Sequence, residues 1–395
     1  MKVYNEEQLK IDLDSNFGRS YQQCAISVMD TIADPAIKFD EKGISNYYTE
    51  FKKAKEENVY EGELGKKKLN EIVLQIKGKG KNKKYDCITG VSGGVDSTYV
   101  ALKAKELGLR PLIVHFDNGW NSERANQNIQ NIIENTGFDL YTLVVDWNEF
   151  RDLQRAYFKA NVVDIEALTD HAIICTLYKL AKEHNIKYIL SGANIVTEHI
   201  LPNHWIWGKT DGINIRAIHR KFGEVKLKTF PTYSAFRIEL LKKRNGIQTI
   251  PLLDYIKYNK AKAKIEIQEK LGWKDYGGKH FESVFTRFYQ GYILPVKFGI
   301  DKRKAHLSTL IFDGQIRKEE ALKELQNPIY DEGLMAEDYE FVRKKLGFSE
   351  QEFENYFDAP RVEHDAFEHD KRNIWKNYPA LKILRPIWNL VKKMR

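Results

Sequence analysis

The sequence predicts an α/β protein in which a parallel sheet carries helices on both faces. From Tyr85 onward, short β-rich runs alternate with amphipathic helical segments. Strands separated by helices of roughly 10–20 residues are typical of βαβ units, which build parallel sheets. Beyond Phe230 the chain becomes helical, aromatic and charged. We therefore expect a small N-terminal segment (1–80), a sheet domain (81–235) and a mainly helical region (236–395).

Local signals bound each element of the sheet domain. The expected strands cover residues 85–91, 109–117, 139–147 and 186–193, and the expected helices cover 95–108, 122–137 and 165–185. Ser122 is a good helix N-cap residue, and Gly108 and Gly137 stand where helices commonly stop. Two short β-runs, 214–219 and 224–230, are expected to follow the last of these strands.

The composition is that of a globular protein. Of 395 residues, 42% are hydrophobic and 30% charged, and no apolar run approaches the length of a membrane span. The first residues are acidic and lack the apolar core of a signal peptide. Three cysteines in such a chain argue against a disulfide framework. These features predict a cytoplasmic protein.

The formal net charge of +8 permits nucleic acid or an anionic small substrate such as a nucleotide. The densest basic run, KGKGKNKK at 77–84, is interpreted as a solvated linker rather than a nucleic-acid arm. The basic tail at 381–395 is interrupted by Pro386, which favours a docked helix over a membrane anchor. We expect neither a nucleic-acid partner nor stable membrane insertion.

The turn SGGVDS follows the first expected strand and opens the first expected helix. Parallel sheets bind ligands at the carboxyl ends of their strands, and helix N-termini offer free N–H groups to anions. Gly93 and Gly94 allow close backbone approach, and Ser92 and Ser97 add hydroxyl donors. Asp96 would repel a phosphate unless Mg²⁺ lies between them. The turn therefore predicts a phosphate site with Asp96 as a catalytic Mg²⁺ ligand, whereas a chance glycine-rich turn is the alternative.

SGGVDS resembles the PP-loop of the ATP pyrophosphatases, which cleave ATP between the α and β phosphates. It is not a Walker A loop, because G-x-x-x-x-G-K-[ST] is absent. The resemblance implies a Rossmann-like sheet of the HUP type for 81–235, with ATP at its edge. The residues implied to bind ATP are Val91, Ser92, Gly93, Gly94, Val95, Asp96, Ser97, Phe116, Asp117 and Gly192. Asp117 could bind ribose or metal, or simply shape the turn before Asn118.

Longer segments resemble the N-acetyl sugar amidotransferases (WbpG- and PseA-like) of lipopolysaccharide and flagellar-glycan biosynthesis. The similar stretches are 28–48, 117–164, 190–202 and 275–311, and include VMDTIADPAIKFDEKGISNYY and LSGANIVTEHILP. That family converts the N-acetyl group of a nucleotide-linked sugar to an acetamidino group. Adenylation of the amide oxygen makes AMP the leaving group, and ammonia then adds. The resemblance implies ATP, Mg²⁺ and such a sugar as ligands, with the helical region holding substrate or partner.

The chain departs from this family at an expected zinc site. The family usually carries two C-x-x-C pairs around the DPxIxFDxxG segment, which here read Cys24, Ser27, Ser45 and Tyr48. Ser and Tyr are poor zinc ligands. We therefore expect no zinc, and a segment held by packing in which Tyr47 and Tyr48 fill the space.

The sequence lacks an evident ammonia source of its own. No cysteine lies in a glycine-flanked nucleophile turn, and residue 2 is Lys. The resemblance implies a separate glutaminase partner, like the HisH/HisF-like two-protein set of histidine biosynthesis.

Two further groups of polar residues are candidates for the site. Asp170 and His171, in LTDHAI, could polarise substrate or move protons, or Asp170 could merely favour a helix start. Cys175, one helical turn later, is interpreted as a packed thiol rather than a nucleophile. The residues expected to bind substrate are Asn194, Lys302, Arg303 and His306. For the last three, a charged helix start is the alternative.

Two other functions remain open at this stage. The positive charge permits a tRNA-modifying PP-loop ATPase of the thiolase or lysidine synthase type, although no C-x-x-C pair exists for thiolation. A non-catalytic scaffold is the other possibility, and the intact SGGVDS turn argues against it.

Overall fold

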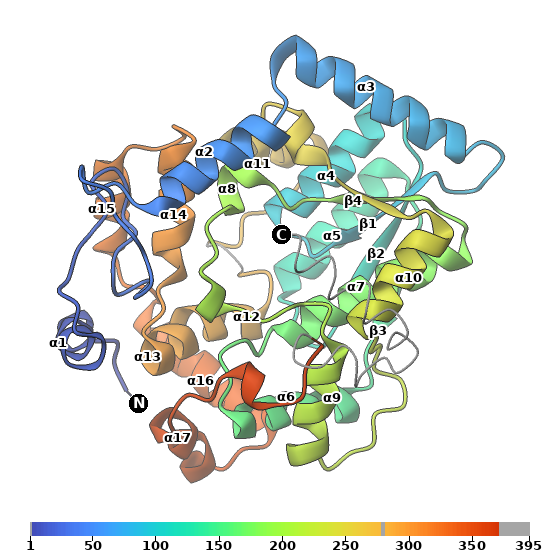
Figure 1. Ribbon diagram of the computed structural model, residues 1–395. Helices are drawn as coiled ribbons and strands as arrows, with labels where there is room; N and C mark the ends of the chain where they lie inside the picture. The colour runs from blue at the N-terminus through green and yellow to red at the C-terminus, as the bar shows by residue number, and fades with distance from the viewer. Residues whose placement is uncertain (1, 278–280, 371–395) are drawn as a thin grey trace, which may run out of the picture.

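The computed structural model describes residues 2–277 and 281–370 (Figure 1). Its centre is a parallel sheet of five strands in the order β3-β2-β1-β4-β5. The strands are β1 (Cys87–Val91), β2 (Pro111–Asp117), β3 (Leu140–Val144), β4 (Tyr188–Ser191) and β5 (Gln248–Pro251). The predicted α/β class, with a parallel sheet, helices on both faces and a mainly helical C-terminal region, is confirmed.

Helices cover both faces of the sheet because its strands are apolar on both sides. In β2, Ile113 packs into one hydrophobic cluster while Leu112 and Val114 pack into another. The first cluster lies under α3 (Gly62–Lys79), α4 (Val95–Glu106), α5 (Glu123–Thr136) and α11 (Lys260–Leu271). The second lies under α7 (Ala167–Glu183) and α10 (Ala235–Asn245). Apolar neighbours on both faces are typical of parallel strands between two helical layers.

The predicted boundary signals of α5 are confirmed. The Ser122 side chain accepts a hydrogen bond from the Ala125 amide at 3.2 Å. Gly137 ends the helix with φ of +72°, a left-handed conformation that glycine adopts at little cost. The sequence therefore fixes both ends of this helix locally.

The prediction of two short β-runs after β4 was wrong. Residues 214–219 lie in α9 (Gly212–Phe222), where Ile215 and Ile218 are buried three residues apart, at helical spacing. Residues 224–230 form no strand, since their amides bond instead to carboxylates of α6 (Trp147–Ala160). Asp152 accepts the Val225 N–H at 3.0 Å, and Glu149 accepts the Phe230 N–H at 3.0 Å. Side chains thus replace a partner strand.

The sheet gains its last strand later in the chain than expected. β5 lies at 248–251, beyond Phe230, and pairs in parallel with β4. Ile250 is the only member of this strand that is buried. The short apolar signal explains why no strand was predicted there.

The remaining helices lie beside the sheet (Figure 1), and most of them contribute residues to one aromatic core. They are α1 (Glu6–Phe17), α2 (Asn46–Asn58), α8 (Ile195–Glu198), α12 (Val284–Phe288), α13 (Leu294–Phe298), α14 (Lys302–Phe312), α15 (Lys318–Leu325), α16 (Glu332–Leu346) and α17 (Glu350–Asp358). A π-helical turn, η3 (Tyr289–Ile293), joins α12 to α13. Phe158 of α6 packs on Phe285 and Phe353, so the core joins the helical region to the sheet domain.

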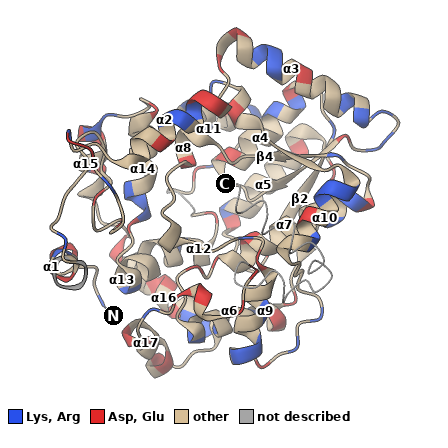
Figure 2. Cartoon of the chain, in the orientation of Figure 1, with Lys and Arg blue, Asp and Glu red and all other residues tan. Residues whose placement is uncertain are grey.

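Basic residues are spread over many helices rather than gathered in one place (Figure 2). The expected linker at 77–84 is shorter than predicted, because α3 continues to Lys79 before the chain turns. The basic tail at 381–395 lies outside the described residues. Within the described ranges, every helix is too short or too polar to span a bilayer.

Candidate active site

The turn at 92–97, called here the 92–97 loop, connects β1 directly to α4. The Ser97 hydroxyl accepts the Ser92 amide and donates to the Gly94 carbonyl, each at 3.3 Å. Gly93 has φ of +80°, and a Cβ there would lie 2.8 Å from the Ala125 carbonyl oxygen. Only glycine fits this position. The loop is therefore held by its own hydroxyls and by contact with α5.

The loop presents the N-terminus of α4 at the carboxyl end of the central strand. The first helical bond runs from the Thr98 amide to the Gly94 carbonyl at 3.1 Å. Amides before that bond are the ones that a helix leaves open to anions. Tyr276 and Glu282 border this end, because a methyl group on Gly94 would lie 3.5 Å from each. The geometry suits a phosphate group enclosed by neighbouring side chains.

Asp96 is paired with residues far away in the sequence. Tyr258 donates its hydroxyl to Asp96 Oδ1, and Lys260 Nζ lies 2.9 Å from Oδ2. Burial would lower the pKa of Lys260, but attraction to Asp96 and Glu198 outweighs it and raises the pKa. Burial and the Asp96 charge raise the pKa of Tyr258. The loop therefore has a permanently charged ammonium group beside its carboxylate.

This donor set fits Mg²⁺ together with a polyphosphate. Mg²⁺ commonly takes one or two protein carboxylates and completes its shell with phosphate oxygens and water. Asp96 would supply the carboxylate, and Lys260, Ser92 and Ser97 would face the phosphates. Within the described residues, no cluster of three or more His, Cys, Asp or Glu side chains is arranged to hold a metal alone. The fit thus requires substrate phosphates as co-ligands.

Sequence reasoning missed Tyr258 and Lys260. They stand in YIKYNK, a segment with no recognisable nucleotide motif. Their position depends on β5, which places the start of α11 next to α4. The only signal in the sequence was that a lone carboxylate in a phosphate loop needs a cation nearby.

The end of β2 differs from the expected adenosine edge. The Phe116 side chain is buried and packs on Phe150, with ring centroids 6.5 Å apart. Asp117 Oδ1 accepts the Gly119 amide at 2.9 Å, which is the turn-forming role considered as its alternative. These two assignments to ATP remain predictions that their contacts do not favour.

His115 of β2 couples this strand end to the 92–97 loop. Its Nε2 accepts from Asn121 at 2.8 Å, so its Nδ1–H donates to the Val91 carbonyl at 3.1 Å. Burial lowers its pKa and keeps the ring neutral. His115 therefore positions the residue before the loop, a role that the sequence did not reveal.

Gly192, at the end of β4, approaches the loop itself. A Cβ there would lie 3.2 Å from the Asp96 carbonyl carbon, so glycine permits β4 and α4 to meet. Asn194 caps α8, since its Oδ1 accepts the Thr197 amide at 2.9 Å and its Nδ2 donates to the Gly192 carbonyl. Both residues lie at the site, and their observed contacts organise its backbone.

The Asp170–His171 pair joins a half-exposed carboxylate to a buried imidazole ring. Asp170 pairs with Lys209 at 3.0 Å, and Lys209 also binds Asp164. His171 has no exposed surface; its Nδ1 donates to the Lys209 carbonyl at 2.8 Å and its Nε2 accepts the Tyr233 amide at 3.1 Å. With both ring nitrogens used, the catalytic assignment of His171 stays a prediction that this conformation does not support.

Cys175 is a packed thiol, as interpreted from the sequence. It is fully buried, and burial raises its pKa to about 12. Cys87, in β1, is also buried with a raised pKa. Neither thiol has the lowered pKa of a nucleophilic cysteine.

The structure separates Lys302, Arg303 and His306, the three residues of segment 299–308 that were expected to bind substrate. Lys302 is half-buried at the start of α14, while the His306 ring lies 3.0 Å from the Thr197 carbonyl, next to α8. Arg303 turns away and pairs with Asp301 at 2.8 Å. His306 is thus the member of this set that approaches the end of β4.

The four positions of the expected zinc site do not form a ligand set. The Ser45 amide donates to Cys24 Sγ at 3.3 Å, and Tyr48 instead packs its ring on Phe312. Burial would raise the pKa of Cys24, but hydrogen bonds from Ser27 and Ser45 outweigh it and lower the pKa. The absence of zinc remains a prediction.

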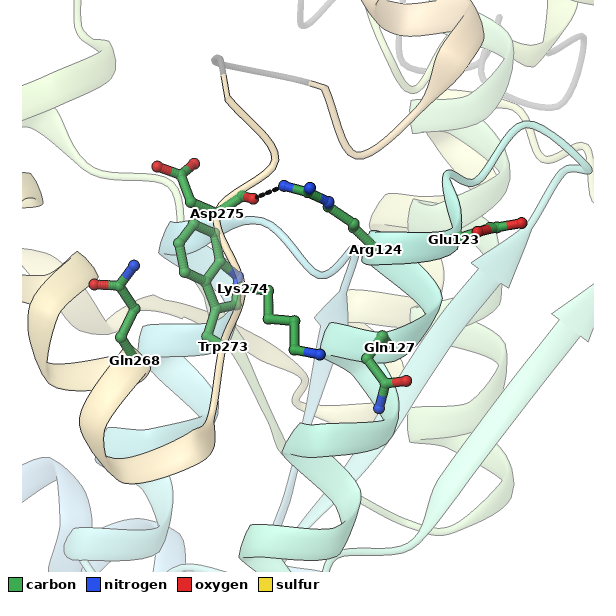
Figure 3. Close-up of a pocket in the computed structure, with 7 residues that line it drawn as sticks. All are labelled: Glu123, Arg124, Gln127, Gln268, Trp273, Lys274 and Asp275. Carbon is green, nitrogen blue, oxygen red and sulfur yellow. Dashed lines mark hydrogen bonds between the residues drawn. The ribbon is translucent and has the colours of Figure 1, made fainter.

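A groove of about 670 Å³ opens beside the loop (Figure 3). Its lining residues are Glu123, Arg124, Gln127, Gln268, Trp273, Lys274 and Asp275. Trp273 Nε1 donates to the Gly93 carbonyl at 2.8 Å, and Arg124 donates to the Asp275 carbonyl. The segment after α11 is therefore fastened to the 92–97 loop.

A family model describes part of this chain. Residues 282–382 match the family described as "LPS biosynthesis protein WbpG-like, C-terminal domain". The resemblance to WbpG-like proteins is thereby confirmed for this region. None of the curated proteins compared with the chain matches it.

Solved structures resemble the chain only distantly. NMN synthetase from Francisella tularensis is 14% identical, with a TM-score of 0.30, over 72% of this chain and 97% of its own. NH3-dependent NAD synthetase from Campylobacter jejuni is 13% identical, with a TM-score of 0.28, over 75% and 98%. A predicted tRNA methyltransferase subunit from Methanocaldococcus jannaschii is 16% identical, with a TM-score of 0.26, over 46% and 76%. Similarity this weak carries no argument about function.

Proposed function

We propose that this protein is an ATP-dependent, AMP-forming amidotransferase acting on a nucleotide-linked N-acetyl sugar. It converts the N-acetyl group to an acetamidino group, in the biosynthesis of a surface polysaccharide such as lipopolysaccharide O-antigen or of a flagellin glycan. One combination supports the proposal. The 92–97 loop, with its Asp96–Lys260 pair, occurs in one chain with a WbpG-like domain.

The chemistry explains why this reaction needs ATP. An amide carbonyl resists ammonia because its oxygen is a poor leaving group. Attack of that oxygen on the α-phosphorus of ATP releases pyrophosphate and gives an adenylated imidate. Ammonia adds to the imidate carbon, AMP leaves with the former amide oxygen, and a proton is lost to give the amidine. Holding both reactants in one dry site raises the rate of such reactions, because it fixes the reacting atoms together and excludes competing water.

The residues of the loop suit the first half of this reaction. The open amides of α4 and the Lys260 ammonium would hold the phosphates that leave. Asp96 would bind the Mg²⁺ that accompanies ATP, and this ion would supply charge neutralisation. Lys260 Nζ lies 2.9 Å from Asp96 Oδ2, so the two side chains keep each other positioned.

The decisive experiment measures both products. UDP- and CMP-linked N-acetyl sugars are incubated with the protein, ATP, Mg²⁺ and ammonium. Mass spectrometry should find the sugar lighter by the difference between O and NH, and chromatography should find AMP and pyrophosphate. ADP and phosphate as products would overturn the proposal.

The ammonia source is tested in the same assay. Free ammonium at high concentration should replace the proposed glutaminase partner, whereas glutamine alone should not. Efficient turnover with glutamine and no second protein would remove the partner from the proposal. A parallel incubation with tRNA in place of the sugar tests a tRNA-modifying ATPase, which the net charge of +8 permits. ATP turnover only with tRNA would favour that alternative.

A further inference from the structure

The chain that follows α11 runs beside the candidate phosphate site. Its residues 273–276 are called here the post-α11 segment. At the start of this segment, Trp273 Nε1 donates to the Gly93 carbonyl at 2.8 Å. At its end, the Tyr276 hydroxyl oxygen would lie 3.5 Å from a Cβ added to Gly94. The two aromatic residues of the segment therefore contact two adjacent glycines of the phosphate loop.

Contacts with two helices hold the post-α11 segment in place. Asn128 of α5 donates to the Lys274 carbonyl at 2.9 Å and accepts the Lys274 amide at 2.8 Å. Arg124 of α5 donates to the Asp275 carbonyl (Figure 3), and Lys264 of α11 pairs with the Asp275 carboxylate. Since the segment is bound on both sides, the residue that follows these contacts has a fixed position.

The Tyr276 side chain is packed and keeps its proton. Its ring meets that of Trp273 edge-on, with ring centroids 5.3 Å apart. Burial and the charges of Glu282 and Asp96 raise the pKa of Tyr276, and the opposing effect of the Val95 amide is smaller. The hydroxyl is therefore a hydrogen-bond donor at every pH at which the protein is expected to work.

This hydroxyl lies at the open end of α4. The first helical bond of α4 is that of the Thr98 amide, so the amides of Val95, Asp96 and Ser97 come before it. The Val95 amide is the one that interacts with the Tyr276 hydroxyl. An anion bound by these amides would lie within reach of the hydroxyl. Amide and hydroxyl would then both donate to the anion.

We propose that Tyr276 is a phosphate-binding residue, and that its hydroxyl donates to the end of ATP that leaves as pyrophosphate. The inference rests on the proposed function, which supplies ATP as the ligand. Lys260 would hold the same phosphates from the side of Asp96. Lys260 supplies charge, whereas Tyr276 supplies direction, because a hydroxyl bond weakens steeply when its acceptor moves out of line.

The test is isothermal titration calorimetry on the full chain in the presence of Mg²⁺. The probes are pyrophosphate, AMP, and α,β-methylene-ATP, which cannot be cleaved between its α and β phosphates. Tyr276→Phe removes the hydroxyl and keeps the ring that packs on Trp273. It should weaken pyrophosphate and α,β-methylene-ATP about tenfold to a hundredfold, as expected for one hydrogen bond to a charged group. The Kd of AMP, which lacks the leaving phosphates, should not change.

Tyr85→Phe is the matched control. The Tyr85 hydroxyl donates to Asp139 at 2.7 Å, before the start of β1, whereas the 92–97 loop follows the end of that strand. This variant loses the same atom from the same residue type, so it should leave the affinity for all three probes unchanged. A merely structural role of Tyr276 would alter the Tm and the binding of AMP as well.

The outcomes separate this inference from the proposed function. Unchanged affinity of Tyr276→Phe for pyrophosphate would overturn the inference and leave the amidotransferase standing. Equal weakening of AMP, or an equal effect of Tyr85→Phe, would also overturn it. Failure of the wild-type chain to bind pyrophosphate with Mg²⁺ would reject both. The expected binding pattern without amidine formation would reject the amidotransferase and keep Tyr276 in a nucleotide site.

Discussion

Two polar clusters of the sheet domain, the 92–97 loop and the Asp170–His171 pair, were both candidates for catalysis. They differ in which of their polar groups remain accessible to a ligand. At the 92–97 loop, the Asp96 side chain keeps 19% of its surface exposed and its cationic partner is likewise accessible. At the second cluster, the Asp170 side chain keeps 49% of its surface exposed, but His171 has 0% exposure and both of its ring nitrogens are engaged. A polar residue can serve a substrate only where packing leaves it an open face.

The residues that bind Asp96 and those that bind His171 also differ in whether a ligand can replace their contacts. Lys260 and Tyr258 come to Asp96 from another element and can exchange it for a ligand. Lys209 binds Asp164 and gives its carbonyl to His171, which ties the start of α7 to the turn before α9. We infer that the first cluster is built for binding and the second for holding the fold.

The largest expected effect is that of Asp96→Asn. The amide fits the same space and can still accept from Tyr258, so the fold should remain. Loss of the carboxylate removes the proposed Mg²⁺ ligand, and AMP formation should fall by about 10³-fold or more. The measurement is AMP release with ammonium as nitrogen donor, with circular dichroism as the check on folding. Near-normal activity would remove Asp96 from the site and erase the contrast between the clusters.

The second effect concerns the cation. Lys260→Met should lower kcat/KM for ATP about 10²-fold, because the phosphates lose a charged partner and Asp96 loses its counter-ion. Lys262→Met is the matched control, since Lys262 is exposed on the same helix. If both variants reduce kcat/KM for ATP equally, Lys260 contributes only to the overall positive charge of this region and makes no specific contact with the phosphates.

The third effect is on stability and its pH dependence. Burial lowers the pKa of His171 to about 4, below its usual value near 6.5. Between these two values the unfolded chain binds more protons than the folded one, so stability falls as pH drops from about 6.5 to 4. The His171→Gln variant cannot take up a proton at this position, so its free energy of unfolding should fall by about 3 kcal/mol less than that of the wild type over this range. At pH 7 the variant should be the less stable of the two proteins.

Urea unfolding of both proteins at pH 7 and pH 5 should show about 2 kcal/mol of this difference, because the rest of the range lies below pH 5. His364, whose pKa burial also lowers, contributes equally to both proteins and cancels. Activity at pH 7 should stay within about threefold of wild type once folding is corrected for. A loss of kcat comparable to that of Asp96→Asn, without a change in stability, would return His171 to the catalytic residues.

How far the sequence predicts this molecule depends on how local each signal is. The 92–97 loop was predictable because its glycines, hydroxyls and carboxylate occupy consecutive positions at a strand end. Lys260 was not, because only the tertiary packing of α11 on α4 brings it there. The helix α9 was misread because Ile215 and Ile218 also fit a short β-run until the Asp211 cap is considered. Burial and partner saturation, which separate Asp96 from His171, are invisible in one sequence.

The smallest expected effect is that of a chelator, and it extends the comparison to a third polar cluster. Cys24, Ser27 and Ser45 are all buried, and the Cys24 thiol accepts an N–H bond from Ser45. A thiol with hydroxyl neighbours lacks the four soft or nitrogen ligands that a structural zinc requires, so hydrogen bonds and packing must hold the segment. Purified protein should contain no stoichiometric zinc by elemental analysis, and EDTA should leave its Tm unchanged. Cys24→Ala should lower the free energy of unfolding by about 1–2 kcal/mol, the cost of a lost hydrogen bond and a small cavity. One zinc per chain, or a fall in Tm on chelation, would mean that this cluster, like the 92–97 loop, keeps an open face for a ligand.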